Sequence, residues 1–154
     1  MRPIREWLTE YGVSHTNKTN KAIHWICVPL IVWSILLLLW GIPVPEFLLD
    51  YSLKWAHVAA VLAILYYFTL SIPLAIGMLV VFWFLLLLCS ILSNIISFPI
   101  WIAGAGIFLL AWVGQFYGHK VEGKKPSFLK DIQFLLIGPL WLLHFIYRRV
   151  GIRI

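Results

Sequence analysis

Two short stretches of the sequence carry side chains that could do chemistry. The first, YGVSHTNKTNKAIHWICVPL, holds His15 and His24 directly before an apolar run. The second, GQFYGHKVEG, holds His119 at the end of another apolar run. Imidazole is the commonest metal ligand in proteins, and three or more imidazoles with oxygen donors suit Fe(II), Zn(II) or Mn(II). The histidines therefore predict a metal site with an open position for a substrate and oxygen.

Helical spacing adds polar neighbours to two of these histidines. Asn20 precedes His24 by one helical turn, and Gln115 precedes His119 in the same way, so each pair shares one helix face. Glu122 follows His119 by three residues. We expect these three polar side chains to orient the imidazole rings by accepting their second N–H.

The other histidines do not follow this pattern. His15 would lie on the face opposite His24 if the helix were continuous, so it joins the site only if the chain bends within SHTNKTN. Ser, Thr and Asn favour such a bend, because their side chains cap helices and form turns. His144 is a fourth candidate ligand, with an ordinary interfacial contact as the open alternative. For His57 we expect the interfacial contact.

The composition indicates which elements must position these residues. Of the 154 residues 62% are hydrophobic and only 12% are charged, and the mean hydropathy of +0.95 lies outside the range of soluble domains. We therefore expect an all-α integral membrane protein, with residues 1–154 forming a single membrane-embedded helical domain. The net charge of +6 suits cytoplasmic loops and anionic lipid headgroups, and we expect no nucleic-acid partner.

Four apolar runs are long enough to be transmembrane helices, at residues 23–40, 56–72, 74–96 and 100–116. A fifth run, 132–147, is short and has Gly138 and Pro139 in its middle. We expect this run to be a re-entrant or interfacial C-terminal helix, because a backbone broken at membrane depth must be buried against protein.

Basic residues predict the orientation in the membrane, because Lys and Arg in short loops favour the cytoplasmic side. The polar segment 1–22, which precedes the membrane, and the loop 117–131 are both basic, and four crossings between them place both in the cytoplasm. This arrangement brings the candidate ligands to one membrane face. The membrane is either a bacterial inner membrane or the endoplasmic reticulum, and homo-oligomerisation is left open.

The first histidine stretch, and the second in its longer form WVGQFYGHKVEGKKPSF, resemble the two signature blocks of the Mpo1-like membrane proteins. The resemblance covers nearly the whole chain. It implies an Fe(II)-dependent dioxygenase that uses O2 to convert a 2-hydroxy fatty acid into the fatty acid one carbon shorter, a step of lipid α-oxidation. It also implies a set of site residues, with iron ligands His15, His24 and His119, the less secure ligand His144, and supporting residues Asn20, Gln115 and Glu122.

Two further expectations concern the substrate and the class of protein. Lys120 or Arg148 is a candidate partner for the carboxylate of an anionic substrate. A non-enzymatic alternative stays open, in which the chain is a small membrane transporter or assembly factor whose histidines bind a metal or protons. A polar path across the spans, or a sample that binds no redox metal, would favour that alternative, and the sequence disfavours such a path because the second and third apolar runs are nearly devoid of polar residues.

Overall fold

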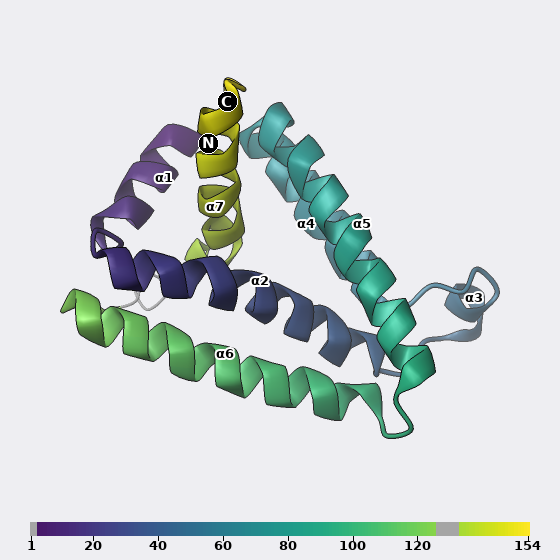
Figure 1. The fold of residues 1–154 in the computed structure, drawn as a ribbon. Helices are drawn as coiled ribbons and strands as arrows, with labels where there is room; N and C mark the ends of the chain where they lie inside the picture. The colour runs from purple at the N-terminus through teal and green to yellow at the C-terminus, as the bar shows by residue number, and fades with distance from the viewer. Residues whose placement is uncertain (1–2, 126–132) are drawn as a thin grey trace.

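The computed structural model describes residues 3–125 and 133–154, and every regular element in these residues is an α-helix. The helices are α1 (Ile4–Val13), α2 (Lys18–Trp40), α3 (Glu46–Leu49), α4 (Trp55–Leu70), α5 (Ile72–Ile95), α6 (Ile100–Glu122) and α7 (Phe134–Val150). Two antiparallel pairs, α2 with α6 and α4 with α5, form most of the molecule, and α7 lies between α1 and the α4–α5 pair (Figure 1).

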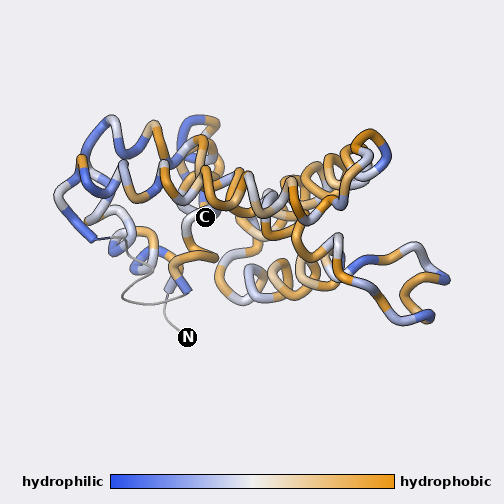
Figure 2. Tube along the Cα trace, turned by 90° about the horizontal axis from the view of Figure 1, so that it is seen from below, coloured by the Kyte–Doolittle hydropathy of each residue, from blue (hydrophilic) through white to orange (hydrophobic). Residues whose placement is uncertain are grey.

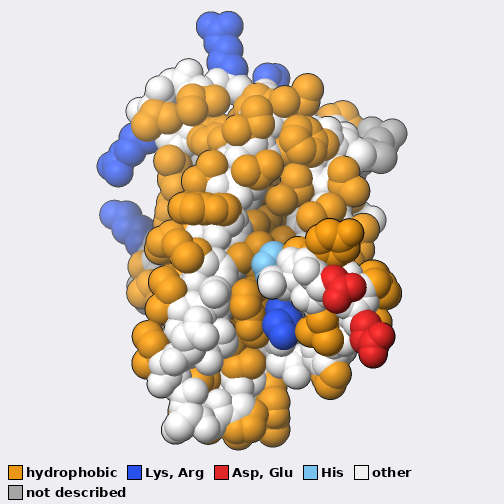
Figure 3. Space-filling model, turned by 90° about the vertical axis from the view of Figure 1, so that its right-hand side faces the viewer, with side chains coloured by type: hydrophobic (Ala, Val, Ile, Leu, Met, Phe, Trp, Pro, Cys, Tyr) orange, Lys and Arg blue, Asp and Glu red, His pale blue; other side chains and the backbone are white. Residues whose placement is uncertain are grey.

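Three helices are long and apolar enough to cross a membrane, namely α2, α5 and α6, and α4 is a shorter apolar helix of 16 residues. Hydrophobic residues run along the paired helices, and hydrophilic residues collect at their ends and around α3 (Figure 2). The face seen in Figure 3 is covered mostly by hydrophobic side chains. The long apolar helices indicate a membrane protein, while the count of four crossings stays a prediction.

The first and last of these long helices extend further than the apolar runs predicted. Helix α2 begins at Lys18 because the side chain of Asn17 caps it, accepting hydrogen bonds from the backbone N–H of Thr19 at 2.8 Å and of Asn20 at 3.4 Å. Helix α6 continues to Glu122 and ends at Gly123, whose φ of +71° is the left-handed conformation that glycine favours. Both extensions carry candidate site residues into regular helix.

Helix α1 lies within the polar segment 1–22, where the expected fold has no helix. Its buried residues recur at helical spacing: Ile4, Trp7, Leu8 and Tyr11. This face packs on α7, where the rings of Trp7 and Phe134 meet edge to face with centroids 5.2 Å apart. The polar segment is therefore part of the packed structure.

Helix α7 corresponds to the predicted fifth run, of which Ile132 lies outside the described residues. The residues around its centre are mostly buried, and Ile137 and Leu140 are fully enclosed. The hydroxyl of Tyr67 donates a hydrogen bond to the carbonyl of Leu136 at 3.0 Å. Helix α7 thus continues through Pro139 without a break and packs against protein there, while its re-entrant or interfacial placement stays a prediction.

Glycines allow α6 to approach α2 closely. A Cβ atom on Gly118 would lie 2.5 Å from Oδ1 of Asn20, and one on Gly114 would lie 2.6 Å from Sγ of Cys27. The pattern Gly-x-x-x-Gly is typical of membrane helices whose backbones pack closely. Because of this contact, the last turn of α6 lies against the first turns of α2.

Candidate metal centre

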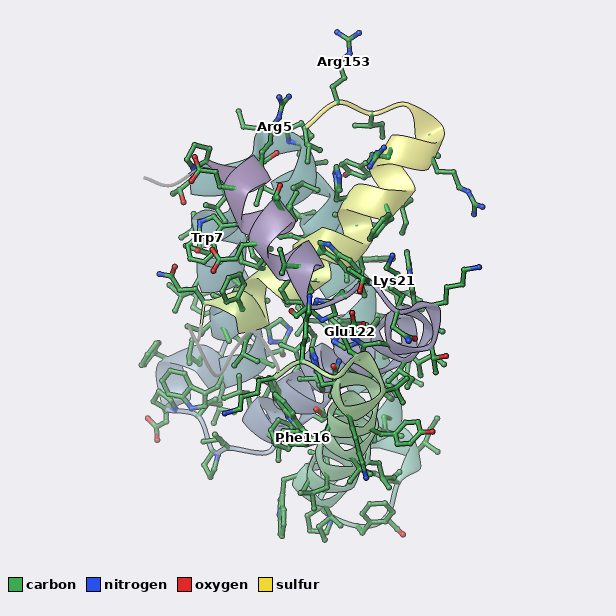
Figure 4. All side chains as sticks on the ribbon, turned by 90° about the vertical axis from the view of Figure 1, so that its left-hand side faces the viewer. Arg5, Trp7, Lys21, Phe116, Glu122 and Arg153 are labelled. Carbon is green, nitrogen blue, oxygen red and sulfur yellow. The ribbon has the colours of Figure 1, made fainter. Side chains whose placement is uncertain are left out.

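The chain bends between α1 and α2, as His15 requires. Helix α1 is terminated at Ser14, and α2 starts after Asn17. The carboxylate of Glu122 reaches this bend from the end of α6 and accepts hydrogen bonds from the backbone N–H groups of Thr16 at 2.8 Å and Asn17 at 2.9 Å, and from the Thr16 hydroxyl. Figure 4 shows Glu122 beside the start of α2. One carboxylate therefore ties the bend to α6.

The side chain of Asn20 supports the same bend. Its Nδ2 donates to the carboxylate of Glu122 at 3.0 Å and to the carbonyl of Ser14 at 3.2 Å. The side chains of Asn20 and Glu122 thus bond to the bend, and the role expected for them at the imidazole rings stays a prediction. Both residues hold the backbone that carries the first histidine, because the short bend offers unpaired N–H and carbonyl groups that need partners.

Three histidines converge beneath this bend. The Nε2 atoms of His15 and His24 lie 2.8 Å apart, and the ring centroid of His119 lies 5.0 Å from that of each. One ligand atom from each ring lies within 4.8 Å of the others. All three side chains are buried, with exposed fractions of 1%, 1% and 5%. This group could hold a metal ion.

Backbone carbonyls orient two of the rings. Nδ1 of His15 lies 2.6 Å from the carbonyl oxygen of Tyr11, and Nδ1 of His24 lies 2.9 Å from that of Asn20, each four residues earlier in the chain. A carbonyl only accepts, so both Nδ1 atoms carry the proton. In the neutral rings both Nε2 atoms are then acceptors facing each other, and this contact is unfavourable unless a cation lies between them.

A metal cation fits this donor set. Burial lowers the pKa of His15 to about 4, so this ring does not carry a second proton at neutral pH. Nitrogens bound at adjacent positions of one metal ion are about 3 Å apart, because each metal–nitrogen bond is about 2.1 Å long. Nδ1 of His119 is buried and has no hydrogen-bond partner among the described residues. Three imidazoles leave positions open for other ligands, but they do not determine which metal binds.

A small cavity of about 40 Å³ adjoins the histidines. Tyr11, Gln115 and Gly138 line it together with His24 and His119. Gln115 is therefore brought to the site, as predicted from its spacing, although its role stays a prediction.

Tyr11 is a site residue that the sequence reasoning missed. Its ring stacks on that of His15, with centroids 4.1 Å apart and planes 10° from parallel, and its carbonyl accepts the proton of the same imidazole. Burial raises the pKa of its hydroxyl, which stays protonated and able to donate. Its position one helical turn before a candidate ligand was the available signal.

The structure separates the remaining candidates from this group. His144 lines a different cavity, of about 640 Å³, together with Arg148. The α7 side chain that contacts His15 is instead Trp141, whose ring centroid lies 5.2 Å from that of the imidazole. Lys120 is exposed. His57 lies on α4, where its Nδ1 accepts the backbone N–H of Lys54 at 3.0 Å and its ring centroid lies 5.2 Å from that of Trp40.

The fold and the site together define a helical membrane protein with a buried group of three histidines able to bind a metal. The chain belongs to the Mpo1-like family, since the family model described as "2-hydroxy-palmitic acid dioxygenase Mpo1-like" matches residues 1–150. It is 28% identical over 142 residues to the 2-hydroxy-palmitic acid dioxygenase MPO1 of Saccharomyces cerevisiae, with 91% of this chain and 77% of that protein covered. No solved structure matches it. The family resemblance of the histidine stretches is confirmed.

Proposed function

We propose that this protein is a membrane-embedded, non-haem Fe(II) dioxygenase that shortens 2-hydroxy fatty acids by one carbon. The observation that carries the proposal is the convergence of His15, His24 and His119 on one buried point beside a cavity. The name of the yeast relative supports a 2-hydroxy fatty acid as the substrate class. The protein would work within a lipid bilayer on this substrate and O2.

The three histidines would hold the iron, and the other residues near the cavity would act on the substrate. When bound, the iron would supply a chelating centre for the hydroxyl and carboxylate of the acid and the redox chemistry with oxygen. Tyr11 would donate its hydroxyl proton in a hydrogen bond to the carboxylate, and Gln115 would offer a second polar contact from α6. The buried surroundings would exclude bulk water.

The proposed reaction balances without any other reductant. The acid R–CH(OH)–COOH and O2 become R–COOH, CO2 and H2O, so the carbon–carbon bond next to the carboxylate breaks. The carboxyl carbon leaves as CO2, and the carbon that carried the hydroxyl becomes the new carboxyl group. The electrons lost by these two carbons suffice to reduce the oxygen molecule.

We also propose that the N-terminus and the site face the cytoplasm, in a bacterial inner membrane or the endoplasmic reticulum. The basic residues of the N-terminal segment and of the end of α6 support this orientation. The iron would then lie near the membrane surface, where a fatty acid presents its carboxylate.

The proposal is tested with protein purified anaerobically without a chelator. We expect about one iron per chain on elemental analysis, since three imidazoles form one site. With O2, 2-hydroxyhexadecanoic acid labelled with ¹³C at the carboxyl carbon should give pentadecanoic acid and ¹³CO2. His24→Ala and His119→Ala should lose both iron and product, whereas His57→Ala should keep both. Retention of metal and chain shortening in the first two variants would falsify the assignment.

A further inference from the structure

A third cavity, of about 130 Å³, lies between α2, α5 and α7. Its lining is entirely apolar and includes Trp25 on α2, Met78, Val81 and Leu85 on α5, and Leu143 on α7. The proposed chemistry of the histidine site does not use this cavity. An apolar cavity offers no hydrogen-bond partner, so it favours a hydrocarbon over a polar occupant.

This apolar cavity adjoins the cavity beside the histidines. Val28 and Val32 of α2 line both cavities. On α7, Gly138 borders the histidine cavity and the next residue, Pro139, borders the apolar one. Gly138 has no side chain, and a Cβ atom there would lie 3.0 Å from the hydroxyl oxygen of Tyr11 and 3.6 Å from Cγ1 of Val28. The junction between the two cavities is thus bounded by small or branched side chains.

The two cavities together match a molecule with one polar end and one hydrocarbon tail. The polar end would meet His24, His119 and the Tyr11 hydroxyl in a cavity of about 40 Å³, which is too small for a phospholipid headgroup. The tail would continue over Val28 and Val32. The apolar cavity also has walls that reach the surface, since Trp25 is 41% and Ile146 is 46% exposed, so a chain could enter from the bilayer.

We propose that the apolar cavity between α2, α5 and α7 binds the acyl chain of a fatty acid whose carboxyl end lies beside the histidines. The identity of that carboxyl end as a 2-hydroxy acid rests on the proposed function. The chain site itself depends only on apolar contacts and does not require the metal. Val81, in the middle of the α5 wall, then limits the length or bulk of chain that fits.

The site is tested by photolabelling metal-free protein in lipid nanodiscs. The probe is hexadecanoic acid with a diazirine near its methyl end, and the labelled residues are mapped by mass spectrometry. We expect label on the α5 wall, at Met78, Val81 or Leu85, and competition by unlabelled hexadecanoic acid. Label confined to the lipid-facing side of α5, or label that the free acid does not reduce, would overturn the proposal.

Matched variants separate the cavity from the lipid surface. Val81→Phe should reduce labelling of the cavity about tenfold, as expected when an apolar pocket loses room for a methylene or two. Val80→Phe is the control, because Val80 is the next residue on α5 and is 59% exposed. Val81→Ala is tested in case the larger phenylalanine side chain prevents folding. We expect the cavity of Val81→Ala to be labelled as well as that of the unchanged protein and to accept longer acids. Equal labelling in folded Val81→Phe and Val80→Phe would contradict the proposal.

The outcomes distinguish this site from the proposed activity. Specific label in the cavity without oxygen-dependent chain shortening would keep the fatty-acid site and reject the dioxygenase. Chain shortening whose preference for acid length is the same in Val81→Phe, Val81→Ala and unchanged protein would keep the dioxygenase and reject the cavity as its chain site.

Discussion

The Nε2 atoms of His15 and His24 lie 2.8 Å apart although the two residues are nine positions apart in the chain. A continuous helix would place them on opposite faces, and the bend after Ser14 brings them together. Each ring also donates its Nδ1 proton to a carbonyl four residues earlier. The lone pairs on the two Nε2 atoms therefore face each other before any metal binds. The fold alone thus holds both rings in the orientation that a metal ion would need.

This arrangement distinguishes His144 from the other candidates. We expect His144→Ala to retain the metal content of the unchanged protein, because His144 lines the separate cavity with Arg148. Elemental analysis of both proteins, prepared side by side, measures this. A loss of metal in His144→Ala as large as that in His119→Ala would restore His144 as a fourth ligand and would require α7 to rearrange.

The close approach of α6 to α2 predicts an effect of adding one methyl group. Gly118→Ala should destabilise the protein by about 1–3 kcal/mol and weaken metal binding, because the new Cβ would lie 2.5 Å from Oδ1 of Asn20. Gly106→Ala is the matched control on the same helix, since nothing lies within 4 Å of its added Cβ. The midpoint of thermal unfolding in detergent and the metal dissociation constant report the two effects. Similar values for the two variants would mean that α6 does not position His119 by this contact.

The contacts of Glu122 predict a role in holding the bend. Glu122→Gln keeps the size of the side chain but removes the charge that strengthens its hydrogen bonds to Thr16 and Asn17. We expect a loss of about 2 kcal/mol in the free energy of unfolding, together with weaker metal binding. Glu46→Gln on exposed α3 should change neither quantity. If metal binding survives Glu122→Gln unchanged, the bend is maintained without this carboxylate.

The lowered pKa of His15 predicts a dependence of stability on pH in the metal-free protein. Between the ordinary value of 6.5 and the folded value of about 4, the unfolded chain binds a proton that the folded chain does not. The contribution of His15 is therefore fully present above pH 6.5 and is lost as the pH falls toward 4, by up to about 1.4 kcal/mol per pH unit. Denaturant unfolding at several pH values, compared with His15→Gln, isolates this contribution. Parallel curves for the two proteins would be inconsistent with a buried neutral imidazole.

The hydroxyl of Tyr11 is predicted to act on the substrate rather than on the metal. Tyr11→Phe keeps the ring that stacks on His15 and the carbonyl that orients it, so the metal content should not change. We expect the KM for 2-hydroxyhexadecanoic acid to rise about 10- to 150-fold, because a hydrogen bond to a carboxylate contributes about 1.5–3 kcal/mol. Steady-state kinetics beside elemental analysis separates the two effects. A loss of metal would instead make Tyr11 a structural support of His15.

The sequence predicted the helical membrane fold and much of the site, because those inferences depend on local patterns. Apolar runs marked the long helices, although α2 and α6 continue past them into polar sequence. Spacing at one helical turn placed Gln115 beside the histidines. The Ser, Thr and Asn residues near His15 permit the bend that brings it to the site, but they do not by themselves require the chain to bend there.

The remaining features depend on contacts between segments that are distant in the chain. Spacing suggested that the side chains of Asn20 and Glu122 would accept hydrogen bonds from the imidazole rings. In the structure, backbone carbonyls accept from the rings of His15 and His24, and the two side chains form hydrogen bonds at the bend. The apolar residues of α1 recur at helical spacing, but their partner, α7, lies more than a hundred residues later in the chain. The separation of His144 from the site follows from the rotation of α7, which no local pattern specifies.

The origin of the three histidines on successive parts of the chain has a consequence for biosynthesis. His15 and His24 leave the ribosome before the first long apolar helix is complete, whereas His119 is made only at the end of the last one, α6. A chain that has inserted α2 alone offers two of the three imidazoles. The third arrives only when α6 docks along α2, so a metal ion held by all three histidines would report that these two helices have come together.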